Sequence, residues 1–288
     1  MKTKLMTDAS CLLPHEIMKK ENIGVLESLL LIDDKEYREL TELNREDFIN
    51  SLPTKDPYPT TSQAGAQDAM DIYEKAIEEG YDEILYLGVT SSLSSQMNVA
   101  RLAAKRFKDK IKITIYPTEL ACGSQGALVN YALHLLKGGK SSEEIISILD
   151  TVKEKIYTLG LAINMTAVFK TGRVKRGSAK GIIASLLKMK PIIEFNIKDG
   201  FIGIGTGTSF KSAFESMVKE IKEKTDPDIT YDLFMADALN PELMNRYAEE
   251  IKKVRKIDEV HYWEMTPVMA LSSGKGAVIA TLCPSITE

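Results

Sequence analysis

The stretch at residues 84–95 constrains the fold more than any other part of this sequence. Residues 84–89 are an apolar run of strand-forming side chains that ends abruptly in a cluster of hydroxyls. A segment with helical character, residues 96–107, follows directly. Strand, polar turn and helix in this order are how an α/β protein presents backbone N–H groups and small hydroxyls to a ligand. The hydroxyls are those of Thr90, Ser91, Ser92, Ser94 and Ser95.

Strands and helices alternate on both sides of this stretch. Strand-like runs at residues 2–6, 24–32 and 111–115 are interspersed with helical segments. Residues 121–126, Ala-Cys-Gly-Ser-Gln-Gly, are predicted to be a small-residue turn that precedes a helix at residues 127–136. This alternation predicts a mostly parallel sheet flanked by helices, with polar turns at the carboxyl ends of its strands, where open α/β sheets place ligands.

The second half of the chain has a different pattern. A hairpin signal, Lys198-Asp199-Gly200, joins two strand-like runs, and helices and strands alternate again from about residue 211. We therefore expect an α/β protein of two domains. The N-terminal α/β domain is predicted at residues 1–158 and the C-terminal α+β domain at residues 159–288.

Composition argues against several classes of protein. A net charge of −4 gives no reason to expect binding to nucleic acid. The chain begins without a signal-peptide core, and no apolar run approaches the ~20 residues of a membrane span, so we expect a cytoplasmic protein. Three distant cysteines and three histidines form neither a disulfide framework nor a metal motif, and we expect no metal and no cofactor.

Two hydroxyl clusters are the candidate ligand contacts. Residues 60–62, all Thr or Ser, precede a predicted helix just as residues 90–95 do. Such clusters often only cap a helix, which remains one interpretation, but a cap needs one hydroxyl rather than several. Uncharged donors beside helix N-termini suit a carboxylate or phosphate that must be released again.

A serine nucleophile is the main alternative. It requires a base, and none of the three histidines, His15, His134 and His261, is adjacent in sequence to a serine turn. The chain also lacks a Gly-x-Ser-x-Gly elbow. Because residues distant in sequence meet in a fold, a serine esterase or acyl transferase stays open as a second hypothesis.

Taken together, these segments resemble the DegV family of bacterial fatty-acid-binding proteins. Thr61-Ser62-Gln63 stands where the family has Thr-Ser-Gln-Pro-Ser, and Thr90-Ser91-Ser92-Leu93-Ser94 is similar to its Ser-Ser-x-Leu-Ser. Seven such motifs occur in family order over nearly the whole chain. They lie at residues 7–14, 33–37, 61–63, 90–94, 117–126, 171–174 and 186–192.

The resemblance implies a protein that holds a long-chain fatty acid in a tunnel between two domains and is not itself an enzyme. It also implies a partner, a separate fatty acid kinase to which the carboxylate is presented. The ligand-binding candidates are Thr61, Ser62, Ser91, Ser94 and Ser272. Arg173, within the basic stretch at residues 169–176, and Lys275 are candidates for contacting an anion or a partner.

Two positions depart from the family pattern. The histidine of the family's C-terminal Gly-x-His-x-Gly-Pro-Gly motif corresponds to Ser272, and an arginine common before the next helix corresponds to Thr208. Loss of a cation and an imidazole donor weakens the hold on a carboxylate, because charge-assisted hydrogen bonds are the stronger kind. Lys275 stands in place of the motif's proline. These departures leave a third hypothesis, a binder of another small anionic lipid or metabolite.

Overall fold

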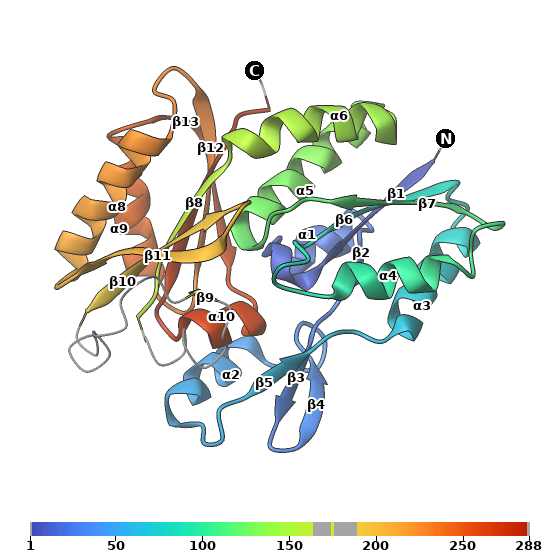
Figure 1. Ribbon diagram of the computed structural model, residues 1–288, viewed down its shortest axis with the longest axis horizontal. Helices are drawn as coiled ribbons and strands as arrows, with labels where there is room; N and C mark the ends of the chain where they lie inside the picture. The colour runs from blue at the N-terminus through green and yellow to red at the C-terminus, as the bar shows by residue number, and fades with distance from the viewer. Residues whose placement is uncertain (1, 164–173, 176–188, 287–288) are drawn as a thin grey trace.

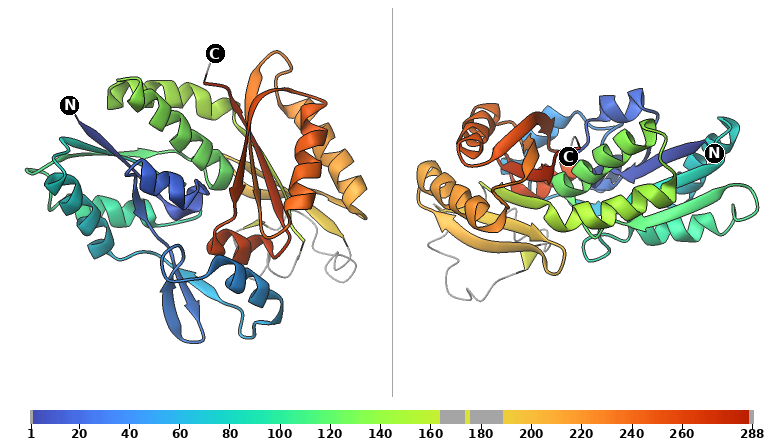
Figure 2. Two further views of the ribbon diagram at one scale, coloured as in Figure 1. Left: turned by 180° about the vertical axis from the view of Figure 1, so that it is seen from behind. Right: turned by 90° about the horizontal axis from the view of Figure 1, so that it is seen from above.

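The computed structural model of the chain describes residues 2–163, 174–175 and 189–286. These residues form a four-stranded, a seven-stranded and a three-stranded sheet, with helices between and outside them (Figure 1). The two larger sheets lie on either side of the molecule, and the three-stranded sheet lies at one end (Figure 2).

The four-stranded sheet is entirely parallel, in the order β2-β1-β6-β7. Its alternate side chains face opposite helical layers, as the two-residue period of a strand requires. Ile84 and Tyr86 pack among residues of α3 and α4, whereas Leu85 and Leu87 pack among residues of α5. The elements are β2 (Gly24–Leu26), β1 (Thr3–Asp8), β6 (Glu83–Gly88), β7 (Lys112–Pro117), α3 (Ala66–Glu78), α4 (Gln96–Ala104) and α5 (Cys122–Lys137).

The seven-stranded sheet is mixed and has the order β13-β12-β14-β8-β10-β11-β9. Most of its neighbouring strands are antiparallel, so the predicted fold class, α/β followed by α+β with an antiparallel component, is confirmed. Helices α8 and α9 cover one face, and α5 packs against β12 and β14. The elements are β8 (Tyr157–Leu161), β9 (Val174–Lys175), β10 (Lys190–Asn196), β11 (Gly200–Gly207), α8 (Phe210–Lys224), β12 (Thr230–Asp237), α9 (Pro241–Lys252), β13 (Lys256–Glu264) and β14 (Val278–Pro284).

Helix α5 lies between the two large sheets, and close packing explains its glycines. A Cβ atom on Gly126 would lie 2.0 Å from the Cys11 carbonyl oxygen, and one on Gly123 would lie 2.4 Å from Oγ1 of Thr281. The prediction of a turn at residues 121–126 is therefore wrong, because the helix already begins at Cys122. The small residues are required by the approach of α5 to its neighbours.

The three-stranded sheet shows a second difference from the sequence prediction. Residues 24–32 are two strands in different sheets, β2 and β3, and not one. The chain turns at Glu27, whose carboxylate accepts a hydrogen bond from the Leu40 N–H at 2.8 Å and whose carbonyl accepts one from Gln96 Nε2 at 3.2 Å. This sheet contains β3 (Leu29–Ile32), β4 (Lys35–Arg38) and β5 (Thr60–Ser62).

The connection between β4 and β5 packs against the second half of the chain. It contains α2 (Arg45–Ser51), which contacts α10 (Pro267–Ser273) at the base of the molecule (Figure 1). The division into domains at residues 158 and 159 stays a prediction; β8 spans that position. The remaining described elements are α1 (His15–Lys20), α6 (Ser142–Val152) and the short 3-10 turns at Ala9–Cys11, Leu52–Thr54 and Lys153–Lys155.

Candidate ligand-binding site

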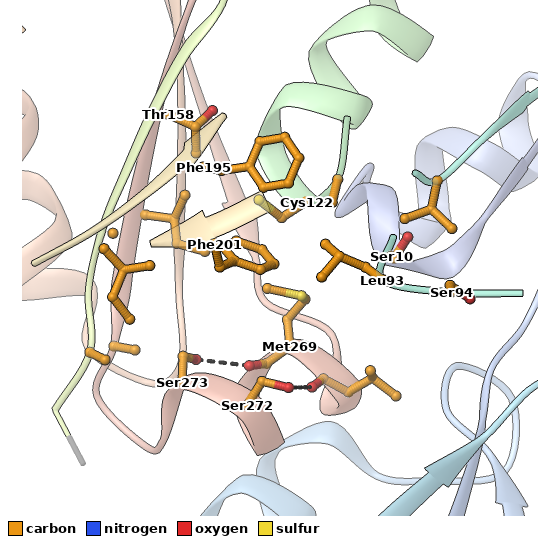
Figure 3. A pocket seen from close by; sticks show the side chains of 18 of the residues that line it. Ser10, Leu93, Ser94, Cys122, Thr158, Phe195, Phe201, Met269, Ser272 and Ser273 are labelled. Atoms are coloured by element: carbon orange, nitrogen blue, oxygen red, sulfur yellow. Dashed lines mark hydrogen bonds between the residues drawn. The ribbon is translucent and has the colours of Figure 1, made fainter. Parts of the chain in front are cut away.

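An apolar pocket is bordered by the strand ends of the parallel sheet, the start of α5, the seven-stranded sheet and α10 (Figure 3). It holds about 920 Å³ of space, the solvent at its mouth included. The lining residues are Asp8, Ser10, Ser28, Val89, Leu93, Ser94, Gln96, Ala121, Cys122, Thr158, Gly160, Leu161, Ala162, Ile193, Phe195, Phe201, Val268, Met269, Ser272, Ser273, Ala277, Val278 and Ile279.

Strand β8 explains why space is left here. Its alternate residues Thr158 and Gly160, continued by Ala162, line the pocket with small side chains. Leu159 and Leu161, which alternate with them, belong to the core beneath α8 and α9, and Leu161 also borders the pocket. Large side chains on one face and small ones on the other produce a filled core on one side of the strand and a cavity on the other.

The seven-stranded sheet contributes a pair of aromatic rings to the pocket lining. Phe195 of β10 and Phe201 of β11 meet edge to face, with ring centroids 5.1 Å apart. Ile193 lies two residues before Phe195 and lines the same space, as strand alternation requires. Figure 3 shows the Phe201 ring beside Met269 and the Phe195 ring beside Cys122, with Leu93 facing Phe201 from the other side. This part of the pocket offers a ligand contact with carbon atoms.

A buried carboxylate lies behind the polar side of the pocket. Asp8, at the end of β1, is 1% exposed, and burial raises the pKa of its carboxyl. Oδ2 accepts hydrogen bonds from the Val89 N–H at 2.8 Å, Gln125 Nε2 at 3.1 Å and Tyr86 Oη at 3.3 Å, and Ser10 Oγ donates to Oδ1. The Asp8 carboxylate therefore accepts these hydrogen bonds from other parts of the protein. Through the Val89 N–H it fixes the start of the hydroxyl-rich turn that follows Val89.

That turn sends its hydroxyls in different directions. Ser94 lines the pocket, and its Oγ also accepts the Gln96 N–H at 3.3 Å. Thr90 and Ser92 share a hydrogen bond of 3.2 Å, and Ser95 donates to Oε1 of Gln63. Local capping and turn contacts therefore account for part of the cluster, and Ser94 is the hydroxyl that borders the cavity.

Helix α10 supplies two more hydroxyls. Ser272 Oγ donates to the Val268 carbonyl at 3.2 Å, and Ser273 Oγ donates to the Met269 carbonyl at 2.8 Å (Figure 3). A serine bonded to the carbonyl four residues earlier is held against its own helix. Both serines line the pocket, and each can donate to a ligand carboxylate only when its O–H turns away from that helix carbonyl.

The first half of the chain ties α10 in place. Glu39 is 1% exposed and its Oε2 accepts the Val268 N–H at 3.2 Å, while Oε1 has no hydrogen-bond partner among the described residues. Burial raises the pKa of Glu39 from its usual 4.5 to about 7. Tyr58 Oη donates to the Leu271 carbonyl at 2.8 Å, and Arg45 Nε donates to that of Met265 at 2.8 Å. These contacts couple α10, and hence its pocket-facing serines, to the segment before β5.

The predicted site residues are only partly brought together. Ser94 and Ser272 line one pocket, whereas the described lining does not include Thr61, Ser62, Ser91 or Lys275. Their roles in binding stay predictions, and Arg173 lies outside the described residues. Thr61 pairs with Leu30 in the three-stranded sheet. Ser62 is exposed, and its hydroxyl donates to the Glu36 carboxylate at 3.2 Å. Ser91 and Lys275 are also exposed.

Several lining residues were not predicted. Ser28 lies between β2 and β3, where the sequence pattern predicted one continuous strand. Gln96 borders the pocket at the start of α4, and Ser273 borders it at the end of α10. The alternation of small and large residues in β8 was the signal that could have located the cavity. The pair of Phe195 and Phe201 had no such signal, because strand pairing across a hairpin brings the two rings together.

Among the described lining residues, no histidine stands ready to activate a serine or cysteine. All three histidines are described and none lines the pocket. Burial raises the pKa of the Cys122 thiol to about 12, which disfavours the thiolate. Across the described ranges, no three His, Cys, Asp or Glu side chains lie where they could hold a metal ion together.

The fold and the site define a class: an α/β protein in which an apolar pocket lies between a parallel sheet and a mixed sheet. The sequence profile of the DegV family matches residues 2–284. The chain belongs to the DegV family. In the described part of the chain, no helix is both long and apolar enough to cross a membrane.

Individual relatives agree with this placement. A DegV domain-containing protein from Listeria innocua is 29% identical over 278 residues, which cover 96% of each chain. The structure of a fatty acid binding DegV family protein from Streptococcus agalactiae is 26% identical, with a TM-score of 0.85 and 99% of each chain covered. A DegV family protein from Eubacterium eligens, solved loaded with heptadecanoic acid, has the same fold: 15% identity, a TM-score of 0.85, and 98% and 100% of the chains covered.

Proposed function

We propose that this protein is a cytoplasmic, non-enzymatic carrier that binds a long-chain fatty acid in the apolar pocket. The observation that carries the proposal is the pocket itself, about 920 Å³ lined mainly by carbon, with hydroxyls at its edge. A similar protein from Streptococcus agalactiae binds fatty acid, which supports the same ligand class here.

Burial of the acyl chain supplies most of the binding free energy. Each methylene removed from water contributes about 0.8 kcal/mol, so ten buried methylenes give roughly 8 kcal/mol before the costs of association. Ile193, Phe195, Phe201 and Met269 are the principal contacts in this proposal. The ligand needs no metal and no cofactor.

The carboxylate is held by uncharged donors. Ser94 and Ser272, which line the pocket, are the first contacts; Thr61, Ser62 and Ser91 complete the head-group site in this proposal, with Lys275 as a cation near its mouth. Neutral hydroxyls hold a carboxylate less tightly than an arginine would, which suits a ligand that is handed on. We propose that the recipient is a separate fatty acid kinase.

Titration of the delipidated protein tests the binding proposal. Isothermal titration calorimetry with oleate should give saturable binding with one ligand per chain, and methyl oleate should bind more weakly because it lacks the charge that the serines hold. Absence of saturable oleate binding would overturn the proposal. Tight binding of a short phosphorylated metabolite in place of oleate would favour the third hypothesis.

Transfer to a kinase is a separate test. The protein loaded with radiolabelled oleate is mixed with ATP and a bacterial fatty acid kinase catalytic subunit. Acyl phosphate should form only when both proteins are present. A loaded carrier that never yields acyl phosphate with the kinase of its own source organism would leave fatty acid binding in place and reject the kinase partner.

A further inference from the structure

A second, charged cleft lies between α5 and the edge of the seven-stranded sheet. It holds about 690 Å³, solvent at its mouth included, and shares no lining residue with the apolar pocket. Its walls carry His134 from the last turns of α5, Asp232 from β12, and Asp258, Glu259 and His261 from β13. The proposed fatty acid site uses none of these side chains.

An irregularity in strand pairing gathers the carboxylates. Tyr231 pairs with Ile257 and Leu233 with Val260, so two residues of β13, Asp258 and Glu259, stand opposite the single residue Asp232. Such a bulge locally disrupts the ladder and re-aims side chains. Both Asp258 and Glu259 therefore line the same cleft as Asp232, whereas regular pairing would have set only Asp258 opposite it.

Asp232 has an unused hydrogen-bonding position. The residue is 6% exposed, and its Oδ1 has no hydrogen-bond partner among the described atoms. Burial raises the pKa of the Asp232 carboxyl. A buried carboxylate oxygen without a donor costs free energy, and a ligand that donates to it recovers this cost.

The charge around this oxygen favours a cation. Lys137, which lines the cleft, forms an ion pair with Glu21 at 2.7 Å, which reduces its effect on the cleft. His261 Nε2 lies 3.6 Å from the Glu259 carboxylate, and the imidazole stacks on Phe234 with centroids 4.5 Å apart. Asp258 accepts a hydrogen bond from Ser285 at 3.0 Å.

The geometry disfavours a metal ion as that cation. In the described structure no three of these carboxylates and imidazoles are arranged to hold one together. An ammonium or guanidinium group needs hydrogen-bond acceptors and not a closed coordination sphere, and it forms strong, charge-assisted hydrogen bonds with carboxylates. A cleft of this volume accommodates a small organic cation or a single basic side chain.

We propose that this cleft is a binding site for an organic cation with a primary ammonium or guanidinium group, in which Asp232 is the buried anchor and Asp258 and Glu259 accept at the rim. Two sources share this chemistry, a free amine and a lysine or arginine side chain of another protein. The site is independent of the apolar pocket.

Nuclear magnetic resonance of the full chain tests this proposal. Backbone amide shifts are followed during titration with agmatine, with N-acetyl-arginine N-methylamide and, separately, with MnCl₂ or ZnCl₂. Saturable shifts around residues 232 and 258–261, with either organic cation, support the site. Binding of agmatine alone indicates a free amine, and binding of the capped arginine indicates a protein side chain. No saturable shift with either, or saturation by a metal ion alone, would overturn the assignment.

Matched variants make the test specific. Asp232→Asn should weaken binding of the organic cation at least tenfold, and Glu259→Gln should weaken it less. Asp228→Asn, which removes an exposed charge outside the cleft lining, should leave binding unchanged. All three should retain oleate affinity. If Asp232→Asn does not fold, as judged by its amide spectrum, Glu259→Gln carries the test. Equal affinity in both cleft variants and the wild type contradicts the proposal.

Discussion

The two sides of the apolar pocket differ in composition and in origin. Of the nine lining residues before position 123, five have polar side chains; of the fourteen from position 158 onward, three do. The first side is built from turns after parallel strands, where backbone N–H groups and hydroxyls collect. The second side is largely sheet surface, whose alternate residues pack against a core. A turn-derived side suits a polar head group and a sheet-derived side suits an alkyl chain.

The largest expected effect concerns the contact that joins the two sides. Glu39, from the first, accepts the Val268 N–H of the second, and its pKa is raised from 4.5 to about 7 by burial. The folded state therefore holds this proton more tightly than the unfolded state, and stability falls as the pH rises from about 4.5 to about 7. The shift corresponds to roughly 3 kcal/mol, which is fully lost above that window.

Glu39→Gln should remove this pH dependence. Gln mimics the protonated acid, so urea unfolding should find the variant more stable than the wild type at pH 8, by up to roughly 3 kcal/mol, and similar to it at pH 4.5. Glu74→Gln, at an exposed position of α3, serves as the control and should follow the wild type at both pH values. Parallel pH profiles for Glu39→Gln and the wild type would show that Glu39 does not titrate as described.

The next effect tests the apolar side. Ile193→Asp puts a carboxylate beside the proposed acyl chain and removes apolar contact, so the Kd for oleate should rise on the order of 100-fold. Ile202→Asp is the matched control, because Ile202 is also half-buried in the neighbouring strand but does not line the pocket. Calorimetry of both variants gives the comparison. If both variants lose the same affinity for oleate, the introduced charge disrupts the sheet and not the pocket specifically.

The smallest effect tests the polar side. Ser94→Ala and Ser272→Ala should each weaken oleate about tenfold, the loss of one hydrogen bond to a charged group, and should change the affinity for methyl oleate much less. Ser92→Ala, in the same turn but outside the pocket lining, is the control and should bind both ligands as the wild type does. Equal weakening of acid and ester would assign the two serines a structural role.

The sequence predicted the order of strands and helices along the chain well wherever an element has its own local pattern. The strand, turn and helix around residues 83–104 and the mixed character of the second half are confirmed. The sequence pattern missed the break between the two strands at Glu27. The hydrogen bonds that hold Glu27 there come from Leu40 and Gln96, which are distant in sequence. Gly123 and Gly126 were assigned to a turn because their partners, Thr281 and Cys11, are remote in sequence.

The site was less predictable than the fold. Hydroxyl clusters indicated which sheet edge to examine, and Ser94 and Ser272 do line the pocket. The cavity itself depends on how β8 divides small and large side chains between two faces and on the pairing of β10 with β11, which brings Phe195 to Phe201. Such contacts arise from packing between distant segments and have no local pattern.

The most direct test of the central claim is to identify what the pocket holds when the protein is purified. Organic extraction of the purified full chain, followed by mass spectrometry, should release a long-chain fatty acid at close to one molecule per chain. The Ile193→Asp protein, purified in parallel, should yield much less. Recovery of no fatty acid from the wild type, together with failure to bind oleate after delipidation, would contradict the account.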